Sequence, residues 1–84
     1  METVWIVGYR NDYWSDNDIY VYRNKEDAMA HFKDIIKDNK NENEFSYEEG
    51  NTEATWEYKA YFCSVSIWEQ IVRWVYDILY KWNL

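Results

Sequence analysis

Carboxylates gather in residues 41–57, which form the most distinctive segment of the chain by charge. The segment has no lysine or arginine and contains six glutamates, namely Glu42, Glu44, Glu48, Glu49, Glu53 and Glu57. Aromatic residues lie among them, namely Tyr47, Trp56 and Tyr58. Carboxylates on a sheet can take the places that phosphates occupy along a nucleic acid, and interfaces favour rigid aromatic anchors. The pattern predicts a partner-binding face for a basic groove, and the alternative is a solvated loop and strand edge.

Catalytic chemistry has few candidate residues. His31 is the only histidine and Cys63 the only cysteine, so a nucleophilic dyad would need this pair. Their positions in the periodic pattern are also typical of a partly buried helix histidine and a small buried apolar side chain. Asp12, Asp16 and Asp18 offer oxygen ligands of the kind that Ca²⁺ uses, but the spacing lacks the glycine and closing glutamate of an EF-hand. We therefore expect no catalytic residue, no metal site and no cofactor.

The overall charge limits the class of partner. The 84 residues include 9 basic and 16 acidic side chains, for a net charge of −7. Direct binding to nucleic acid or to an anionic membrane is disfavoured, because both need lysine and arginine to replace counterions. A basic protein partner is favoured instead. The N-terminus lacks the pattern of a secretory signal, and one free cysteine agrees with a reducing compartment, so we expect a cytoplasmic protein.

Short periodic segments predict one small α+β domain over residues 1–84. Apolar and β-branched residues predict strands at 4–9 and 19–22, paired as an antiparallel hairpin. Asn24 is a favoured N-cap, and the spacing of Ala28, Met29, Phe32, Ile35 and Ile36 predicts a helix that ends near Asn39. Alternation predicts strands at 45–49 and 54–64, paired as a second hairpin. With a helix at the C-terminus, the predicted order is β-β-α-β-β-α, with about four strands and two helices.

The C-terminal helix is predicted over residues 66–82. Ser66 and Glu69 have the spacing of a capping box, and Glu69, Arg73, Asp77 and Lys81 follow at successive i, i+4 steps. The rest of this segment is large and apolar. It predicts a dimer seam or a core seam, comprising Trp68, Val72, Trp74, Val75, Leu79 and Trp82.

The opening stretch VWIVGYRNDYWSDNDIYVYRNKEDAMAHF resembles small proteins encoded by phages and mobile elements. The shared features are two strands followed by a polar residue, acidic residues and an alanine that open a helix, here residues 24–28. Short acidic chains of this style include anti-CRISPR and other anti-defence inhibitors, which occupy a site on a host defence protein. The resemblance implies a non-catalytic inhibitor in the host cytoplasm, and no catalytic residue transfers from it.

Three functional hypotheses follow from these patterns. The first is an inhibitor that blocks a nucleic-acid-binding or nucleotide-handling defence protein, such as a nuclease or effector, through the acidic, aromatic face of residues 42–58. The second is a binding protein for a nucleotide signal, with aromatic rings stacking on the base and Arg10, Arg23 or Lys59 holding the phosphate. The third is a dimeric accessory protein without an inhibitory role.

Overall fold

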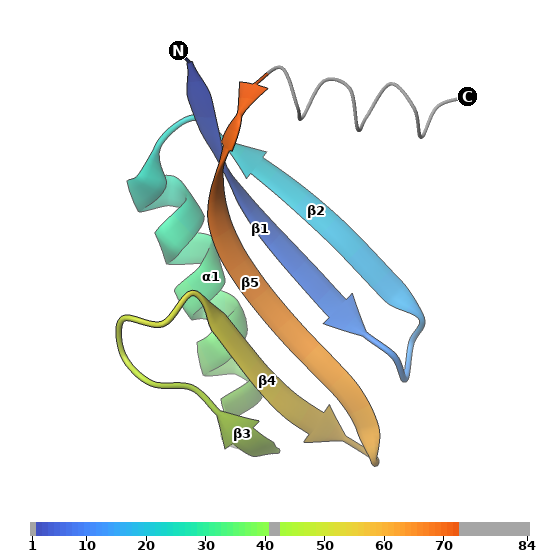
Figure 1. Cartoon of the computed structure of the whole chain (residues 1–84). Coiled ribbons are helices and arrows are strands. Elements are labelled where there is room, and N and C mark those ends of the chain that lie inside the picture. Colours follow the sequence, from blue (N-terminus) through green and yellow to red (C-terminus); the bar gives the residue numbers. More distant parts are fainter. Residues whose placement is uncertain (1, 41–42, 73–84) are drawn as a thin grey trace, which may run out of the picture.

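An antiparallel sheet with a helix against one face forms the fold (Figure 1). The computed structural model describes residues 2–40 and 43–72. The elements are β1 (Thr3–Asn11), β2 (Asp16–Tyr22), α1 (Lys25–Lys40), β3 (Glu44–Ser46), β4 (Glu53–Tyr58) and β5 (Tyr61–Ile71). The strand order is β2-β1-β5-β4-β3. The α+β class is confirmed, but the described residues contain five strands and one helix where four and two were predicted.

The predicted first hairpin is confirmed. β1 pairs antiparallel with β2, and its other edge pairs antiparallel with β5, so this apolar strand is central in the sheet. The buried Asn11 holds the connecting turn, since its side-chain oxygen accepts hydrogen bonds from the backbone N–H groups of Tyr13 and Trp14, at 3.0 and 3.3 Å. Its amide group also donates to the Tyr9 hydroxyl at 3.0 Å. An asparagine that bonds backbone groups ahead of it is a common turn former.

The helix α1 begins where the sequence predicts. The Asn24 side-chain oxygen accepts a hydrogen bond from the Asp27 backbone N–H at 2.9 Å, which satisfies one of the free donors of the first turn. Ala28, Phe32 and Ile36 are buried against the sheet. They pack with a cluster from the strands that comprises Val7, Ala54, Trp56, Cys63, Val65 and Ile67. The core therefore lies between α1 and one face of the sheet.

The prediction of one strand over residues 54–64 is wrong. The chain reverses at Lys59 and Ala60, whose φ angles are 50° and 66°, and two antiparallel strands result. A two-residue hairpin loop with positive φ at both positions matches the twist of the flanking strands, although asparagine and glycine are the residues expected there. The reversal places Phe62 on the sheet face opposite Trp56, whereas a single strand over residues 54–64 would place both on one face.

The predicted helix start at Ser66 is also wrong, because β5 continues to Ile71. Ser66 pairs with Gly8 and Glu69 with Trp5 in the register of β1 and β5. The Ser66 hydroxyl donates to a Glu53 carboxylate oxygen at 3.1 Å and caps no helix. Pairing with a central strand outweighs a local capping signal, because it buries Val65 and Ile67 and completes the backbone hydrogen bonds. The remainder of the predicted helix, residues 73–82, lies outside the described residues.

Candidate protein-binding face

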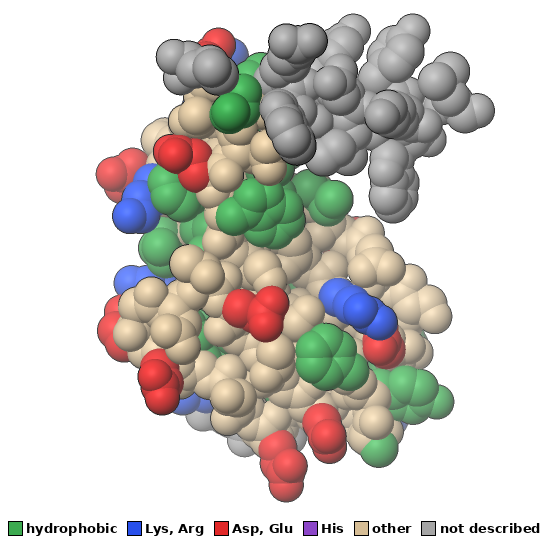
Figure 2. Space-filling view, in the orientation of Figure 1, with side chains coloured by type: hydrophobic (Ala, Val, Ile, Leu, Met, Phe, Trp, Pro, Cys, Tyr) green, Lys and Arg blue, Asp and Glu red, His purple; other side chains and the backbone are tan. Residues whose placement is uncertain are grey.

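One face of the sheet faces away from α1, and we call it the open face. In Figure 1, α1 lies behind the sheet, so the reader looks onto the open face. Strand register assigns its side chains, because Ile6, Gly8 and Arg10 alternate with the core residues of β1. Figure 2 shows this face in the same orientation, with carboxylates and hydrophobic side chains on it and few lysine or arginine side chains. Among residues 2–40 and 43–72, no helix packs on this face of the sheet.

Three carboxylates share the β3–β4 end of the open face, and we call them the acidic patch: Glu44, Glu53 and Glu57. All three residues are exposed. Glu44 and Glu57 are directly opposite each other in the pairing of β3 with β4. Like charges in directly opposite positions destabilise a sheet. The described ion pairs, Arg10–Asp12 and Lys33–Glu49, include none of the patch residues.

A shallow hollow of about 350 Å³ lies at this end of the sheet. Its lining contains two carboxylates, two hydroxyls and an aromatic ring from the open face, together with parts of Phe45 and Trp56; the open-face residues are Glu44, Ser46, Thr55, Glu57 and Phe62. A guanidinium or ammonium group suits such a lining, because carboxylates form short charge-assisted hydrogen bonds and aromatic rings attract cations. The Arg10 guanidinium already lies over the Phe62 ring, 5.7 Å from its centroid. The hollow therefore has the chemistry to receive a basic side chain.

The predicted aromatic anchors lie on the other face of the sheet. Trp56 is 3% exposed and stacks on Phe45 with ring centroids 5.5 Å apart. Tyr47 and Tyr58 are half-buried and pack against the same core. Ala54, Trp56 and Tyr58 alternate with Glu53 and Glu57 along β4, so the strand sends its rings to the core and its carboxylates to the open face. The three rings therefore pack in the core layer beneath β3 and β4.

The other predicted glutamates separate from the patch. Glu48 and Glu49 lie in the turn that ends with Asn51, whose N–H donates to the Glu48 carbonyl at 3.0 Å. Gly50 supplies the positive φ of 92° that this turn needs. Glu49 approaches the Lys33 ammonium of α1 at 3.7 Å, so its charge is shared with the helix. Glu42 lies outside the described residues.

Only part of the predicted seam falls within the described residues. Trp68 lies on the open face with its ring over Gly8, where an added methyl group would meet the ring at 3.1 Å. Val72 is half-buried, and its N–H donates to the Glu2 carbonyl at 3.2 Å. The remaining seam residues, Trp74, Val75, Leu79 and Trp82, lie outside the described residues.

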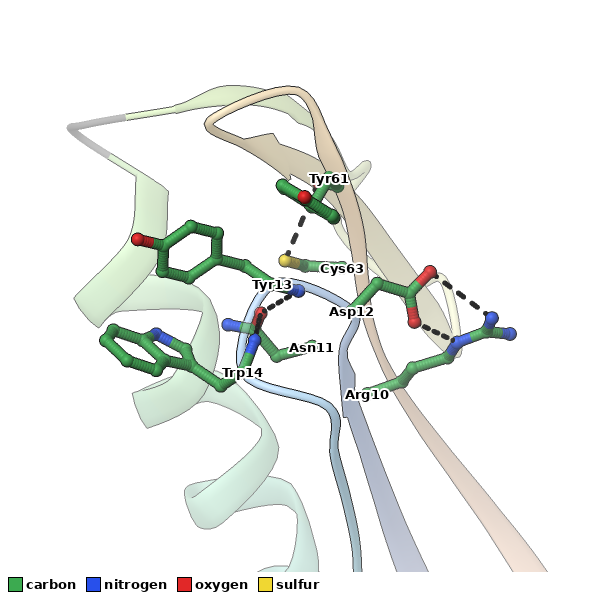
Figure 3. A network of polar contacts seen from close by, with 7 residues as sticks. All are labelled: Arg10, Asn11, Asp12, Tyr13, Trp14, Tyr61 and Cys63. Carbon is green, nitrogen blue, oxygen red and sulfur yellow. Dashed lines mark hydrogen bonds and ion pairs between the residues drawn. The ribbon is translucent and has the colours of Figure 1, made fainter.

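The two candidate catalytic residues have separate surroundings. The His31 ring nitrogen Nδ1 lies 2.6 Å from the Tyr22 hydroxyl, between α1 and β2. Cys63 is buried beside the turn after β1, where its thiol contacts the Tyr61 carbonyl at 3.9 Å (Figure 3). Burial raises the pKa of the Cys63 thiol, which disfavours the reactive thiolate. His31 pairs with Tyr22 and Cys63 with Tyr61, so among the described residues the two do not form a dyad.

The aspartates considered for Ca²⁺ do not converge either. Asp12 accepts two hydrogen bonds from the Arg10 guanidinium, at 2.8 and 3.3 Å (Figure 3). Asp16 and Asp18 lie on β2, opposite Asn11 and Tyr9. Within residues 2–40 and 43–72, no group of three or more histidine, cysteine, aspartate or glutamate residues is arranged to hold a metal ion.

The three cationic residues of the nucleotide hypothesis, Lys59, Arg10 and Arg23, have different surroundings. The Lys59 ammonium lies 4.9 Å from the ring centroid of Tyr13 and 5.4 Å from that of Tyr58. A hydrogen bond to the Tyr13 hydroxyl raises the Lys59 pKa. Arg10 is held by Asp12 and Phe62 on the open face, and Arg23 is exposed just beyond β2. The described structure does not gather these cations around one ring.

Sequence reasoning missed Ser46, Thr55 and Phe62 as members of the candidate site. Phe62 was missed because the reversal at Lys59–Ala60 has no asparagine or glycine to signal it. Ser46 and Thr55 could have been found from the strand register, because the pairing of Glu44 with Glu57 also places Ser46 opposite Thr55. Their common feature is position on the open face.

In the described part of the chain, no helix has both the length and the apolar character needed to cross a bilayer. Comparisons with protein-family models, with curated proteins and with solved structures return no match to this chain.

Proposed function

We propose that the protein is a non-catalytic inhibitor that binds a basic cleft of a nucleic-acid-binding or nucleotide-handling protein through its acidic patch. The observation that carries the proposal is the placement of Glu44 directly opposite Glu57, with Glu53 on the same face of β4. Three carboxylates on two paired strands form a negative surface whose spacing is fixed by the sheet. A positively charged cleft can exchange its phosphate contacts for such a surface.

The energetics of the pair support a binding role. Opposite Glu57, a lysine at position 44 would suit the sheet better, because opposite-charge pairs contribute about 0.2–1 kcal/mol relative to alanine pairs. Two facing glutamates give up that stabilisation. A partner that places an arginine or lysine between them would relieve the repulsion and form charge-assisted hydrogen bonds to both.

The proposed target is a host defence protein, and the proposed compartment is the cytoplasm of the host cell. Support for this part comes from the resemblance of the opening stretch to small phage-encoded chains. The net charge of −7 also favours fast, salt-sensitive association with a basic protein over direct contact with nucleic acid. The inhibitor would act by occupancy and would not require a reacting group of its own.

The proposal is tested by capture with matched charge variants of the full chain. One variant neutralises the acidic patch (Glu44→Gln, Glu53→Gln, Glu57→Gln), and the control removes three charges from α1 (Glu26→Gln, Asp34→Asn, Asp38→Asn). We expect the wild type and the control to retain the same basic protein from host lysate, and nucleic acid or nucleotide to release it. The patch variant should retain much less.

Two results would overturn the proposal. One is equal retention of the same protein by the patch variant and the α1 control. The other is a captured protein that neither nucleic acid nor nucleotide displaces, since the proposed surface occupies the place of a phosphate ligand. Because both variants change the net charge by the same amount, a general charge effect cannot mimic the expected difference.

A further inference from the structure

The open face has a second region, separate from the acidic patch. It is apolar and lies over β2, β1 and β5, and we call it the apolar patch: Ile6, Ile19, Val21 and Trp68. Ile6 is 4% exposed, but its neighbours Val21 and Trp68 are 44% and 39% exposed, and Ile19 is 53% exposed. Contiguous exposed apolar side chains on a small protein mark a surface that something covers.

A hollow continues from this patch along the sheet. It measures about 400 Å³, and its lining is of mixed polarity, comprising Gly8, Tyr9, Arg10, Asn17, Asp18, Ile19, Ser64 and Ser66. The two serines are small, so β5 leaves space beside Ile19, next to the Trp68 ring that lies over Gly8. An exposed apolar patch beside a hollow with charged residues at its lining suits a segment that carries both bulky apolar and charged side chains.

The chain leaves the described structure next to this patch. Ile71, at the end of β5, pairs with Thr3 at the start of β1, and Ile6 lies three positions after Thr3 on β1. At about 3.3 Å per residue, that separation is on the order of 10 Å. Residues 73–84 follow directly and comprise twelve residues. Even at a rise of about 1.5 Å per residue they reach roughly 18 Å, which is enough to turn back and cross the patch.

The composition of residues 73–84 matches the surface. The segment is largely apolar and aromatic, including Trp74, Val75, Ile78, Leu79 and Trp82, and its charged side chains are Arg73, Asp77 and Lys81. Its net charge is therefore +1, in a chain whose total is −7. Attraction to the acidic body of the protein adds to apolar burial, so both terms favour docking.

A second copy of the chain suits the patch less well. Face-to-face pairing would bring together two chains of net charge −7, each with its acidic patch on the face being buried. Separate molecules also lose translational freedom on association, whereas a segment tethered a few residues away has an effective concentration on the order of millimolar. We propose that residues 73–84 of the same chain cover the apolar patch, leaving the acidic patch free.

The proposal is tested by nuclear Overhauser effects in the unmodified full chain. Methyl protons of Ile19 and Val21 are expected to show contacts to protons of residues 73–84. The same contacts should vanish in an isotope-filtered sample that mixes labelled and unlabelled chains, because that sample reports only contacts between molecules. Absence of the contacts overturns the proposal, and contacts only between molecules overturn it in favour of a dimer.

A variant pair gives an independent readout. Val21→Lys places a charge in the apolar patch, and Ser46→Lys makes the same charge change on the same face, at the β3 edge. We expect trypsin to cleave after Arg73 about tenfold faster in Val21→Lys than in the wild type, because release of the segment exposes the site. Ser46→Lys should leave the rate unchanged. Equal rates in the two variants would contradict docking on the patch.

Discussion

Replacing Glu57 by lysine is expected to stabilise the fold and to weaken binding of the basic partner. Glu57 lies directly opposite Glu44, so the substitution converts a like-charge pair into an opposite-charge pair. We expect the free energy of unfolding to rise by about 0.5–1 kcal/mol. Affinity for the captured partner should fall by about 2 kcal/mol or more, roughly 30-fold, because a lysine then occupies the place of the partner's cation.

The double variant Glu44→Lys, Glu57→Lys is the control for this prediction. It restores a like-charge pair, so the gain in unfolding free energy should disappear while the loss of affinity remains or grows. Chemical denaturation and a binding titration at fixed salt measure the two quantities. If Glu57→Lys keeps the wild-type affinity, that result would contradict the proposed role of the Glu44–Glu57 pair, whatever the stability of the variant.

Phe32→Ala is expected to have the largest effect on stability. Phe32 is fully buried at the centre of the layer between α1 and the sheet, and its ring contacts Tyr47 with centroids 5.9 Å apart. Truncation of a buried phenylalanine costs about 3–5 kcal/mol. A small domain has only about 5–10 kcal/mol of stability, so most of the margin should be lost.

Thermal unfolding of Phe32→Ala and of Asp34→Ala, an exposed change on the same helix, measures this effect. Asp34→Ala should alter the unfolding free energy by less than about 0.5 kcal/mol. Similar midpoints for the two variants would show that the α1 contact with the sheet is not the core of the protein. Binding measurements on the acidic patch should be made on folded variants only, since β3 and β4 depend on this layer.

The first 40 residues were predictable because their signals are local. The β1–β2 hairpin has turn residues between two apolar runs, and α1 has an N-cap and an apolar stripe that the structure uses as expected. The second half was harder to predict. The reversal between β4 and β5 uses Lys59 and Ala60 with positive φ, and neither residue type announces such a turn.

Of the six glutamates in the predicted face, three share one face of the sheet, and the predicted aromatic anchors lie on the other face. Glu44, Glu53 and Glu57 lie together because alternation along β3 and β4 sends them to one face. The same alternation sends Trp56 to the core, which a list of residue types cannot reveal without knowing which face α1 covers. The indole N–H of Trp56 has no hydrogen-bond partner among the described residues, an unsatisfied group inside the same layer.

A titration of the isotope-labelled full chain with an octa-arginine peptide tests the central claim most directly. The account predicts that backbone amide shifts concentrate at residues 44, 46, 55, 57 and 62, around the hollow lined by Glu44 and Glu57. Added salt should reverse the shifts, since exposed charges are screened over a Debye length of about 8–10 Å. Shifts centred on the α1 carboxylates, or spread evenly over all acidic residues, would contradict it.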